Sequence, residues 1–225
     1  MITIVFWNIR KKPDVLEHHL ECLLRTYSVD VFILAECPKN VKPALRALDS
    51  AGVGTYREEA KVKAKVRALT RLGQKEFIHR FSSLNREMAV WSIATSKLRS
   101  TEVLLAGVHL PSKSGGAKDT DQASIAREVV EELNDVEDRH NHRSTVVVGD
   151  FNMHPYDAGM TSVTSFHGLM TKDLAGLPDR LHRRQPRRRF YNPMWGLFGD
   201  RTPGPSGSYY WRASVLHNPY WGMLD

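Results

Sequence analysis

The chain has 225 residues, of which 41% are hydrophobic and 25% are charged, and its net charge is +7. These proportions exclude an intrinsically disordered chain, and no apolar run reaches the length needed to span a bilayer. The positive charge favours polyanionic partners, with nucleic acid as the first candidate.

The length suits one large α/β domain or two small ones, and no linker or internal repeat divides the chain. We therefore expect a single domain over residues 1–225. The N-terminus lacks the basic lead and the cleavage site of a secretion signal, so we expect a cytoplasmic protein without a membrane partner. Cys22 and Cys37 form no C-x-x-C pair, which argues against a structural zinc site and favours two reduced thiols.

The first half of the chain begins with two predicted strands and a helix between them. Residues 2–7 form a continuous apolar run that is typical of a strand buried on both faces. Pro13-Asp14 with Glu17 resembles a helix start with a capping box, and the next leucines share one helical face: Leu16, Leu20, Leu23 and Leu24. A second buried strand over residues 31–35 ends at Glu36.

Residues 55–80 show a different pattern. Between positions 61 and 68, lysine or arginine alternates with valine or alanine. This period of two predicts an edge or half-exposed strand with a basic outer face. A basic helix is the competing interpretation.

The second half of the chain continues the alternation of strands and helices. Residues 88–95, 103–110 and 145–148 are predicted strands, and residues 122–139 carry the apolar stripe of a helix. From Asp173 onward the pattern loosens. It includes a basic run over residues 183–189 and a loop over residues 203–207 that is rich in glycine and proline.

Four of the predicted strands end in a polar residue of catalytic type. The strands end at Asn8, Glu36, His109 and Asp150, and Asn152 follows two residues later. Because strand ends meet in a shared crevice in α/β sheets, we expect these side chains to lie together. Such a cluster suits a hard cation and a phosphate group.

Each of these residues also has an ordinary structural interpretation. Glu36 is explained equally by a loop carboxylate, Asn8 by a turn cap and His109 by a structural histidine. The segment Gly149-Asp150-Phe151-Asn152 is explained by a turn whose side chains bond their own backbone. The occurrence of all of them in this order, each at a strand end, favours the functional interpretation.

The motifs that contain these residues resemble the endonuclease/exonuclease/phosphatase superfamily, which includes exonuclease III-like and deoxyribonuclease I-like enzymes. They are Trp7-Asn8, Leu34-Ala35-Glu36, Val108-His109-Leu110 and Gly149-Asp150-Phe151-Asn152. The resemblance covers essentially the whole chain. It implies an α/β (α+β) fold of four layers, in which two packed and mostly antiparallel β-sheets are flanked by helices.

The resemblance also implies a bound Mg²⁺ or Mn²⁺ and a role for each matching residue. Glu36 would be the principal metal ligand, with Asn8 beside it. Asp150 would activate the attacking water, Asn152 would hold the scissile phosphate, and His109 would stabilise the transition state. Asp225, in the segment Met223-Leu224-Asp225, would support a catalytic histidine.

The chain departs from the superfamily pattern at one place. The closing signature, a Ser-Asp-His on a final strand, is absent, and none of the ten histidines follows an aspartate. We therefore expect a C-terminally incomplete domain and a poor catalyst. We also expect an exposed sheet edge at the C-terminus that a protein partner would cover.

The leading hypothesis is a divalent-metal-dependent phosphodiester hydrolase, a nuclease acting on DNA or RNA. One alternative is a phosphomonoesterase or lipid-headgroup phosphodiesterase on the same fold. Another is a catalytically impaired binding module. The arginines of the basic run would contact phosphates, although a solvated loop explains them equally: Arg183, Arg184, Arg187, Arg188 and Arg189.

Overall fold

The computed structural model describes residues 1–38, 40–50, 52, 54–59, 62–98, 102–113, 116, 118–200, 202–212 and 220–225, with backbone only at residues 13–18 and 21. The chain divides into two compact units, Met1–His109 with Leu133–Asp150, and Leu110–Glu132 with Phe151–Asp225. The single domain expected over residues 1–225 stays a prediction.

The first sheet of the first unit has four strands in the order β1 (Ile4–Asn8), β2 (Val31–Ala35), β4 (Val66–Thr70) and β3 (Arg57–Glu58). β1 and β2 are parallel, and the other two pairings are antiparallel. β2 is buried at every residue, because it lies inside the sheet and is covered on both faces. The continuous apolar run predicted this double burial.

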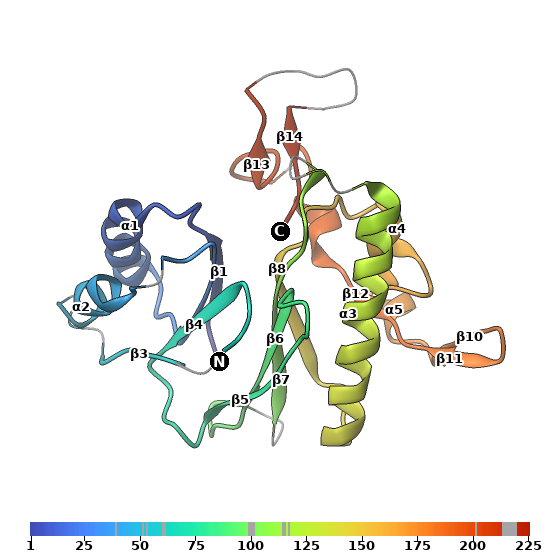
Figure 1. Cartoon of the computed structure of the whole chain (residues 1–225), viewed down its shortest axis with the longest axis horizontal. Helices are drawn as coiled ribbons and strands as arrows, with labels where there is room; N and C mark the ends of the chain where they lie inside the picture. The colour runs from blue at the N-terminus through green and yellow to red at the C-terminus, as the bar shows by residue number, and fades with distance from the viewer. Residues whose placement is uncertain are drawn as a thin grey trace. The chain divides into compact units, whose positions relative to one another are not determined.

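The second sheet has the order β5 (Phe77–Ser82), β6 (Met88–Ile93), β7 (Val103–His109) and β8 (Thr145–Asp150). β7 and β8 are parallel, and the other two pairings are antiparallel. Each sheet thus contains one parallel pair, which in the second sheet is joined by a long helical crossover. Both sheets are mostly antiparallel, as the resemblance implied (Figure 1).

The two sheets share a core of small and branched side chains. Alternate residues of β2, such as Val31 and Ile33, pack in one buried cluster with Trp91 of β6 and Leu105 of β7. Gly107 lies in this layer, where an added Cβ would stand 2.8 Å from Ile33 Cγ2. The absence of a side chain therefore lets β7 approach the first sheet closely.

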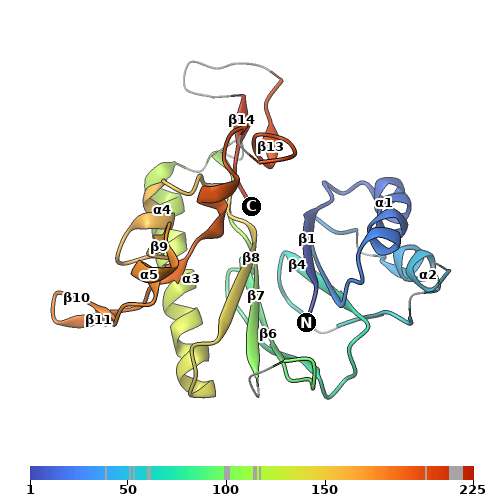
Figure 2. The ribbon, with the colours of Figure 1, turned by 180° about the vertical axis from the view of Figure 1, so that it is seen from behind.

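Helices cover the outer faces of both sheets. Phe32 and Leu34 of β2 pack with Leu20 of α1 (Pro13–Thr26) and Leu48 of α2 (Lys42–Ser50). The C-terminal part of helix α3 (Asp119–His140), from Leu133 onward, belongs to this unit and leads into β8 (Figures 1 and 2). Its Glu137 accepts a 2.6 Å hydrogen bond from Thr145, the first residue of β8. The predicted four-layer sandwich is therefore confirmed in this unit.

Two local predictions were wrong and a third was partly wrong. Helix α1 begins at Pro13 with Lys12 at the N-cap and no side-chain capping bond, so the predicted capping box does not form. β1 is only half-buried, because it is the edge strand of its sheet. Among the described residues of the alternating segment, the strand β4 begins at Val66 and runs to Thr70, and it lies between β2 and β3. The segment therefore forms the predicted strand in place of a helix, with Arg67 partly exposed, but the strand is not at the sheet edge.

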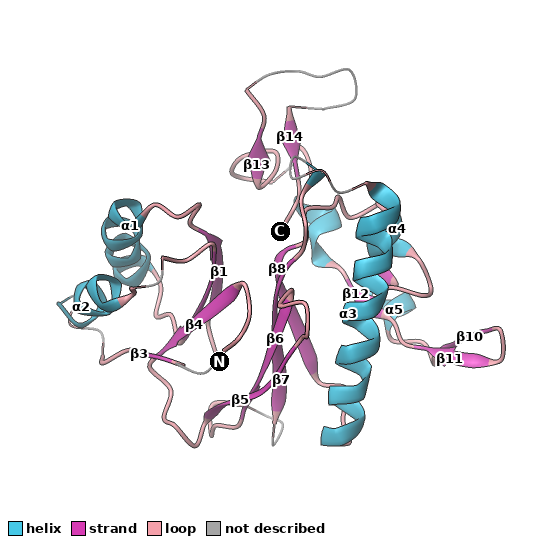
Figure 3. Ribbon diagram, in the orientation of Figure 1, coloured by secondary structure: helices cyan, strands magenta, loops and turns pink. Residues whose placement is uncertain are grey.

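The second unit contains short elements. Its helical elements are the N-terminal part of α3, α4 (Ala158–Thr161), α5 (Lys172–Ala175) and the 3₁₀ helix η2 (Pro193–Leu197). Two of its strand pairs are β9 (Gly168–Leu169) with β12 (Phe190–Tyr191), and β13 (Tyr209–Tyr210) with β14 (Trp221–Gly222). Figure 3 shows how much of this unit is loop. Among the described residues, no helix combines the length and the apolar character needed to cross a membrane.

The basic run forms a β-hairpin instead of an irregular loop. β10 (Arg180–His182) pairs antiparallel with β11 (Gln185–Arg187). The two turn residues, Arg183 and Arg184, have φ values of 49° and 64°. Positive φ at both central positions is the requirement of a two-residue type I′ turn, whose twist matches that of paired strands. The turn therefore presents two exposed arginines side by side.

Candidate active site

Four of the predicted residues gather at one end of the first unit, each placed by a strand. Asn8 ends β1 and pairs in register with Ala35, the last residue of β2, so Glu36 follows beside it. His109 and Asp150 are register partners at the ends of β7 and β8. The parallel pairing within each sheet brings the two C-terminal ends together, and the packing of the sheets brings the pairs together.

Asn8 links the two carboxylates of this cluster. Its Nδ2 donates to Asp150 Oδ2 at 2.9 Å and to Glu36 Oε1 at 3.3 Å. Its Oδ1 accepts from the backbone N–H of Arg10 at 3.0 Å, which fixes the amide orientation. The amide is therefore held with its donor group toward the carboxylates, where it offsets part of their repulsion.

Glu36 has an unusual backbone conformation for its residue type. Its φ is 49°, in the left-handed region that a side chain with a Cβ rarely adopts. Its carbonyl accepts a 3.0 Å hydrogen bond from the backbone N–H of Lys11, which holds the turn after β2. Its side chain is 33% exposed, so the carboxylate remains open to a ligand.

His109 faces both carboxylates but is not hydrogen-bonded to either. Its Nε2 lies 3.8 Å from Glu36 Oε1 and 4.0 Å from Asp150 Oδ2. Burial lowers the pKa of His109 below its ordinary value, against the opposing effect of the Asp150 and Glu36 charges. The ring is therefore neutral at neutral pH and offers a single N–H. Its buried Nδ1 has no hydrogen-bond partner among the described residues.

Two further residues near His109, Lys65 and Glu87, were not predicted from the sequence. Glu87 is 7% exposed, and its carbonyl accepts the backbone N–H of His109 at 2.8 Å. Its side chain forms an ion pair with Lys65 Nζ at 3.3 Å. Both charges act on the His109 ring, where Lys65 lowers its pKa and Glu87 raises it. No strand-end pattern marks them, because Glu87 reaches His109 through the pairing of β6 with β7 and Lys65 reaches it through the ion pair with Glu87.

The donor set of this cluster fits a hard divalent cation. Glu36 and Asp150 supply two carboxylates that point to the same amide, and Mg²⁺ typically takes one or two carboxylates together with waters. The partial exposure of Glu36 leaves room for the remaining ligands. Glu36 is therefore the residue that would hold the metal, and the metal-ligand role expected of Asn8 stays a prediction.

Asn152 and Asp225 belong to the second unit. Asn152, with φ of 52°, donates from Nδ2 to the carbonyl of Leu110 at 2.8 Å, and its own carbonyl accepts from Gln122 at 2.9 Å. Asp225 is half-buried and follows Leu224, whose carbonyl accepts the Phe151 N–H. The phosphate-binding role of Asn152 and the histidine-supporting role of Asp225 stay predictions.

The arginines of the basic run differ in their surroundings. Arg183 and Arg184 are exposed at the hairpin turn, whereas the three that follow are half-buried. Arg187 contacts Gln185 at 3.4 Å, and Arg189 donates to the carbonyl of Pro178. The carbonyl of Arg188 contacts His167 Nδ1 at 2.9 Å. Of these five arginines, Arg183 and Arg184 are the two that are exposed, and both lie at the turn of the hairpin.

No protein-family model matches the chain, and no curated protein matches it. Solved structures with a similar fold include the human Nocturnin catalytic domain with bound sulfate, at 17% identity over 72% of this chain and 70% of that chain, with a TM-score of 0.49. They also include sphingomyelinase C from Streptomyces griseocarneus, at 14% identity over 70% and 66%, with a TM-score of 0.48.

A third similar structure is truncated TDP2 from Caenorhabditis elegans, at 14% identity over 69% of this chain and 64% of that chain, with a TM-score of 0.47. The likeness is one of fold at low identity.

Proposed function

We propose that this protein is a divalent-metal-dependent phosphodiester hydrolase that acts on nucleic acid. The observation that carries the proposal is the convergence of Asn8, Glu36, His109 and Asp150 at one end of the two packed sheets. Two carboxylates, a neutral imidazole and an amide make a site suited to a metal-assisted attack of water on phosphorus.

Each side chain of the cluster has a role that its surroundings support. A bound Mg²⁺ or Mn²⁺ would polarise the phosphoryl oxygen and favour departure of the leaving oxygen. Asp150, held by Asn8 at 2.9 Å, accepts a proton from the attacking water. The new P–O bond forms as the bond to the leaving oxygen breaks. His109, neutral because burial lowers its pKa, donates its N–H to a phosphoryl oxygen.

The choice of nucleic acid as substrate class rests on charge. The net charge of +7 favours a polyanion over a neutral phosphoester. The β10–β11 hairpin carries Arg183 and Arg184 at its exposed turn, where they are free to follow a phosphate backbone. These contacts are independent of base sequence, so the proposal covers single-stranded and double-stranded DNA and RNA.

The test is hydrolysis of labelled single-stranded and double-stranded DNA and RNA with Mg²⁺ or Mn²⁺. Asp150→Asn and Glu36→Gln keep the side-chain shapes and remove one charge each, and each should lower the rate by about 10²–10⁴. Glu128→Gln, at an exposed position of α3, makes the same chemical change outside the cluster and should leave the rate unchanged.

Three results are distinguishable. Cleavage that requires the metal and is lost in both variants of the cluster supports the proposal. Cleavage that persists in Asp150→Asn and Glu36→Gln places the chemistry elsewhere and overturns it. Cleavage of bis(p-nitrophenyl) phosphate without cleavage of any nucleic acid keeps the phosphodiesterase chemistry and refutes the substrate class.

A further inference from the structure

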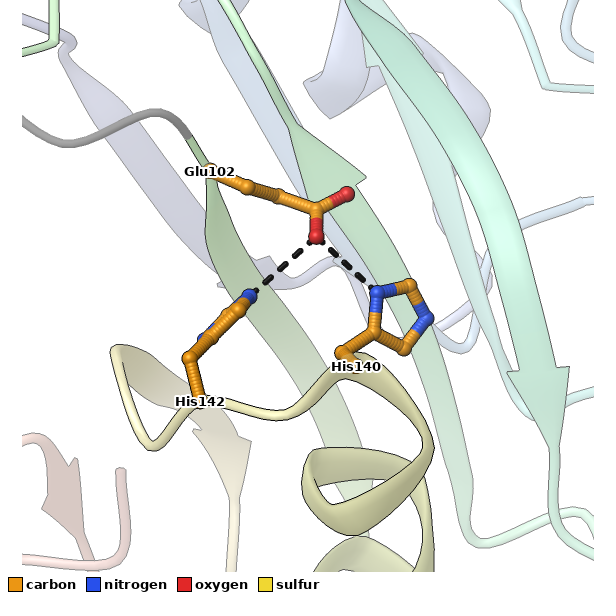
Figure 4. A group of neighbouring side chains, drawn as sticks. All are labelled: Glu102, His140 and His142. Atoms are coloured by element: carbon orange, nitrogen blue, oxygen red, sulfur yellow. Dashed lines mark hydrogen bonds and ion pairs between the residues drawn. The ribbon is translucent and has the colours of Figure 1, made fainter.

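A second group of metal-ligating side chains lies in the first unit, away from the candidate active site. Glu102 directly precedes β7, His140 is the last residue of α3, and His142 lies in the loop before β8. Figure 4 shows both histidine rings directed at the Glu102 carboxylate. The start of β7, the end of α3 and the loop before β8 thus bring these three side chains together.

The two histidines share one oxygen of this carboxylate. His140 Nδ1 lies 2.9 Å from Glu102 Oε2, and His142 Nε2 lies 3.2 Å from the same atom. The ligand atoms of all three side chains lie within 4.8 Å of one another. Ligands about 2.0–2.1 Å from a tetrahedral zinc ion stand roughly 3.3 Å apart, so small shifts of these side chains would admit the ion.

The other oxygen of Glu102 is oriented by a second set of contacts. Arg80 Nη2 lies 3.5 Å from Oε1, and Arg80 Nε donates to Ser92 Oγ at 2.8 Å. Burial raises the pKa of Glu102, but hydrogen bonds from His140, His142 and Ser92 lower it more, to about 2. The group is therefore a carboxylate at neutral pH, with one oxygen turned toward the histidines.

We propose that Glu102, His140 and His142 form a binding site for Zn²⁺. Two imidazoles and one carboxylate suit zinc, whereas Mg²⁺ prefers oxygen ligands alone. Three protein ligands leave a fourth position for water. The bound ion would connect the start of β7, the end of α3 and the entry to β8.

This site is separate from the candidate active site. Glu102 and His109 flank the same strand at opposite ends, and a strand of seven residues spans about 20 Å. Asp150 likewise stands at the far end of β8 from the loop that carries His142. The proposal therefore does not depend on the proposed hydrolase function, and each can fail alone.

The metal-free structure predicts a specific change when zinc binds. The backbone N–H of Ser144 donates to His142 Nδ1 at 3.2 Å, so the ring proton of the neutral imidazole lies on Nε2. Zinc at Nε2 displaces that proton, and the neutral ring then carries its proton on Nδ1. The Ser144 N–H consequently loses its acceptor, which should move its amide NMR resonance.

The binding experiment uses the Glu36→Gln, Asp150→Asn double variant, in which the other candidate metal site is disabled. Titration with Zn²⁺, followed by calorimetry and by metal analysis after dialysis, should give one equivalent bound. His140→Asn and His142→Gln place an amide nitrogen near the lost ring nitrogen and keep a donor to Glu102. Because they remove a zinc ligand, each should weaken binding more than about tenfold.

His19→Ala, at an exposed position of α1, serves as the histidine control and should leave the affinity unchanged. The amide spectrum of the unsubstituted protein needs no variant that risks misfolding, and it should show the Ser144 resonance shifting on addition of zinc. Absence of zinc binding in the double variant overturns the proposal. So does binding that persists in His140→Asn and His142→Gln, or a Ser144 resonance that zinc does not move.

Discussion

Asn8 donates a 2.9 Å hydrogen bond to Asp150 although the two residues lie 142 positions apart in the sequence. The same Nδ2 lies 3.3 Å from Glu36 Oε1, so one amide connects the ends of both sheets. Since Asp150 is 8% exposed, water compensates little for the loss of this donor. The amide therefore both stabilises the fold and positions the proposed base.

Asn8→Ala should lower the free energy of unfolding by about 2 kcal/mol, because a buried carboxylate loses a hydrogen bond. The rate of phosphodiester cleavage should fall by roughly 10²-fold, because Asp150 is no longer held in position. Urea unfolding and steady-state kinetics measure the two effects. Asn85→Ala, at an exposed turn, is the matched control, and equal losses in both variants would contradict the assigned role.

Glu36→Gly should abolish activity and yet stabilise the metal-free protein. The φ of 49° costs a residue with a Cβ about 1–2 kcal/mol, and glycine adopts it freely. Glycine also has more conformational entropy in the unfolded chain, and this opposes the gain by about 0.5–1 kcal/mol. The expected net effect in urea unfolding is a stabilisation of between about 0 and 1.5 kcal/mol.

Glu36→Gln is the comparison for this prediction, because it removes the charge and keeps the backbone strain. It should lower the rate by the same factor of about 10²–10⁴, without the stabilisation that glycine gives. Destabilisation by Glu36→Gly would show that the left-handed backbone is not strained at this position.

Asp30 should make the stability of the protein depend on pH in the acid range. Its carboxylate is 2% exposed and accepts from the Thr3 N–H at 2.9 Å, from Lys97 at 2.7 Å and from Arg71 at 3.0 Å. Burial raises its pKa, but these bonds lower it more, so the folded-state value lies below the ordinary 3.8. The unfolded chain thus binds the proton more readily.

The contribution of Asp30 to stability is therefore complete above about pH 4 and is lost as the pH falls through the lowered folded-state pKa. Asp30→Asn should cost about 3 kcal/mol at pH 7, because it leaves Arg71 and Lys97 without their buried partner. It should also flatten the decline of stability below pH 4. Urea unfolding from pH 2 to pH 7 tests both, and an unchanged acid slope in the variant would be inconsistent with the lowered pKa.

The charges of Arg183 and Arg184 can be removed by substitutions that keep the conformation of the hairpin turn. Asn-Gly is the preferred sequence of a type I′ turn, so Arg183→Asn with Arg184→Gly should keep the β10–β11 pairing. If both arginines contact phosphates, nucleic-acid affinity should fall and the slope of log K against log salt should decrease by about 2.

Circular dichroism and amide NMR check that the hairpin remains. Arg46→Ala, at an exposed position of α2, is the control for loss of one surface charge elsewhere. An unchanged salt slope in the double variant would show that the two turn arginines do not contact phosphates. In the double variant, the cleavage rate at saturating substrate should be unchanged, because the turn arginines contribute to binding and not to the chemical step.

The sequence by itself determined the features that depend on local pattern. The unbroken apolar run of residues 31–35 predicted a buried strand because a strand covered on both faces needs apolar residues at every position, and β2 is buried throughout. The spacing of apolar residues in 122–139 likewise predicted the long helix α3. The positions of Asn8, Glu36, His109 and Asp150 at strand ends followed from where these runs stop.

Only the tertiary structure decided which elements become neighbours. The alternation around Val66 was compatible with an edge strand, but β4 pairs on both sides, which no local pattern encodes. Pro13 starts α1 without a capping box, because its missing N–H suits the first turn. Lys65 and Glu87 join His109, and Glu102 joins His140 and His142, through strand pairing and packing. Such long-range contacts depend on the register of whole sheets, and a single residue's chemistry does not reveal that register.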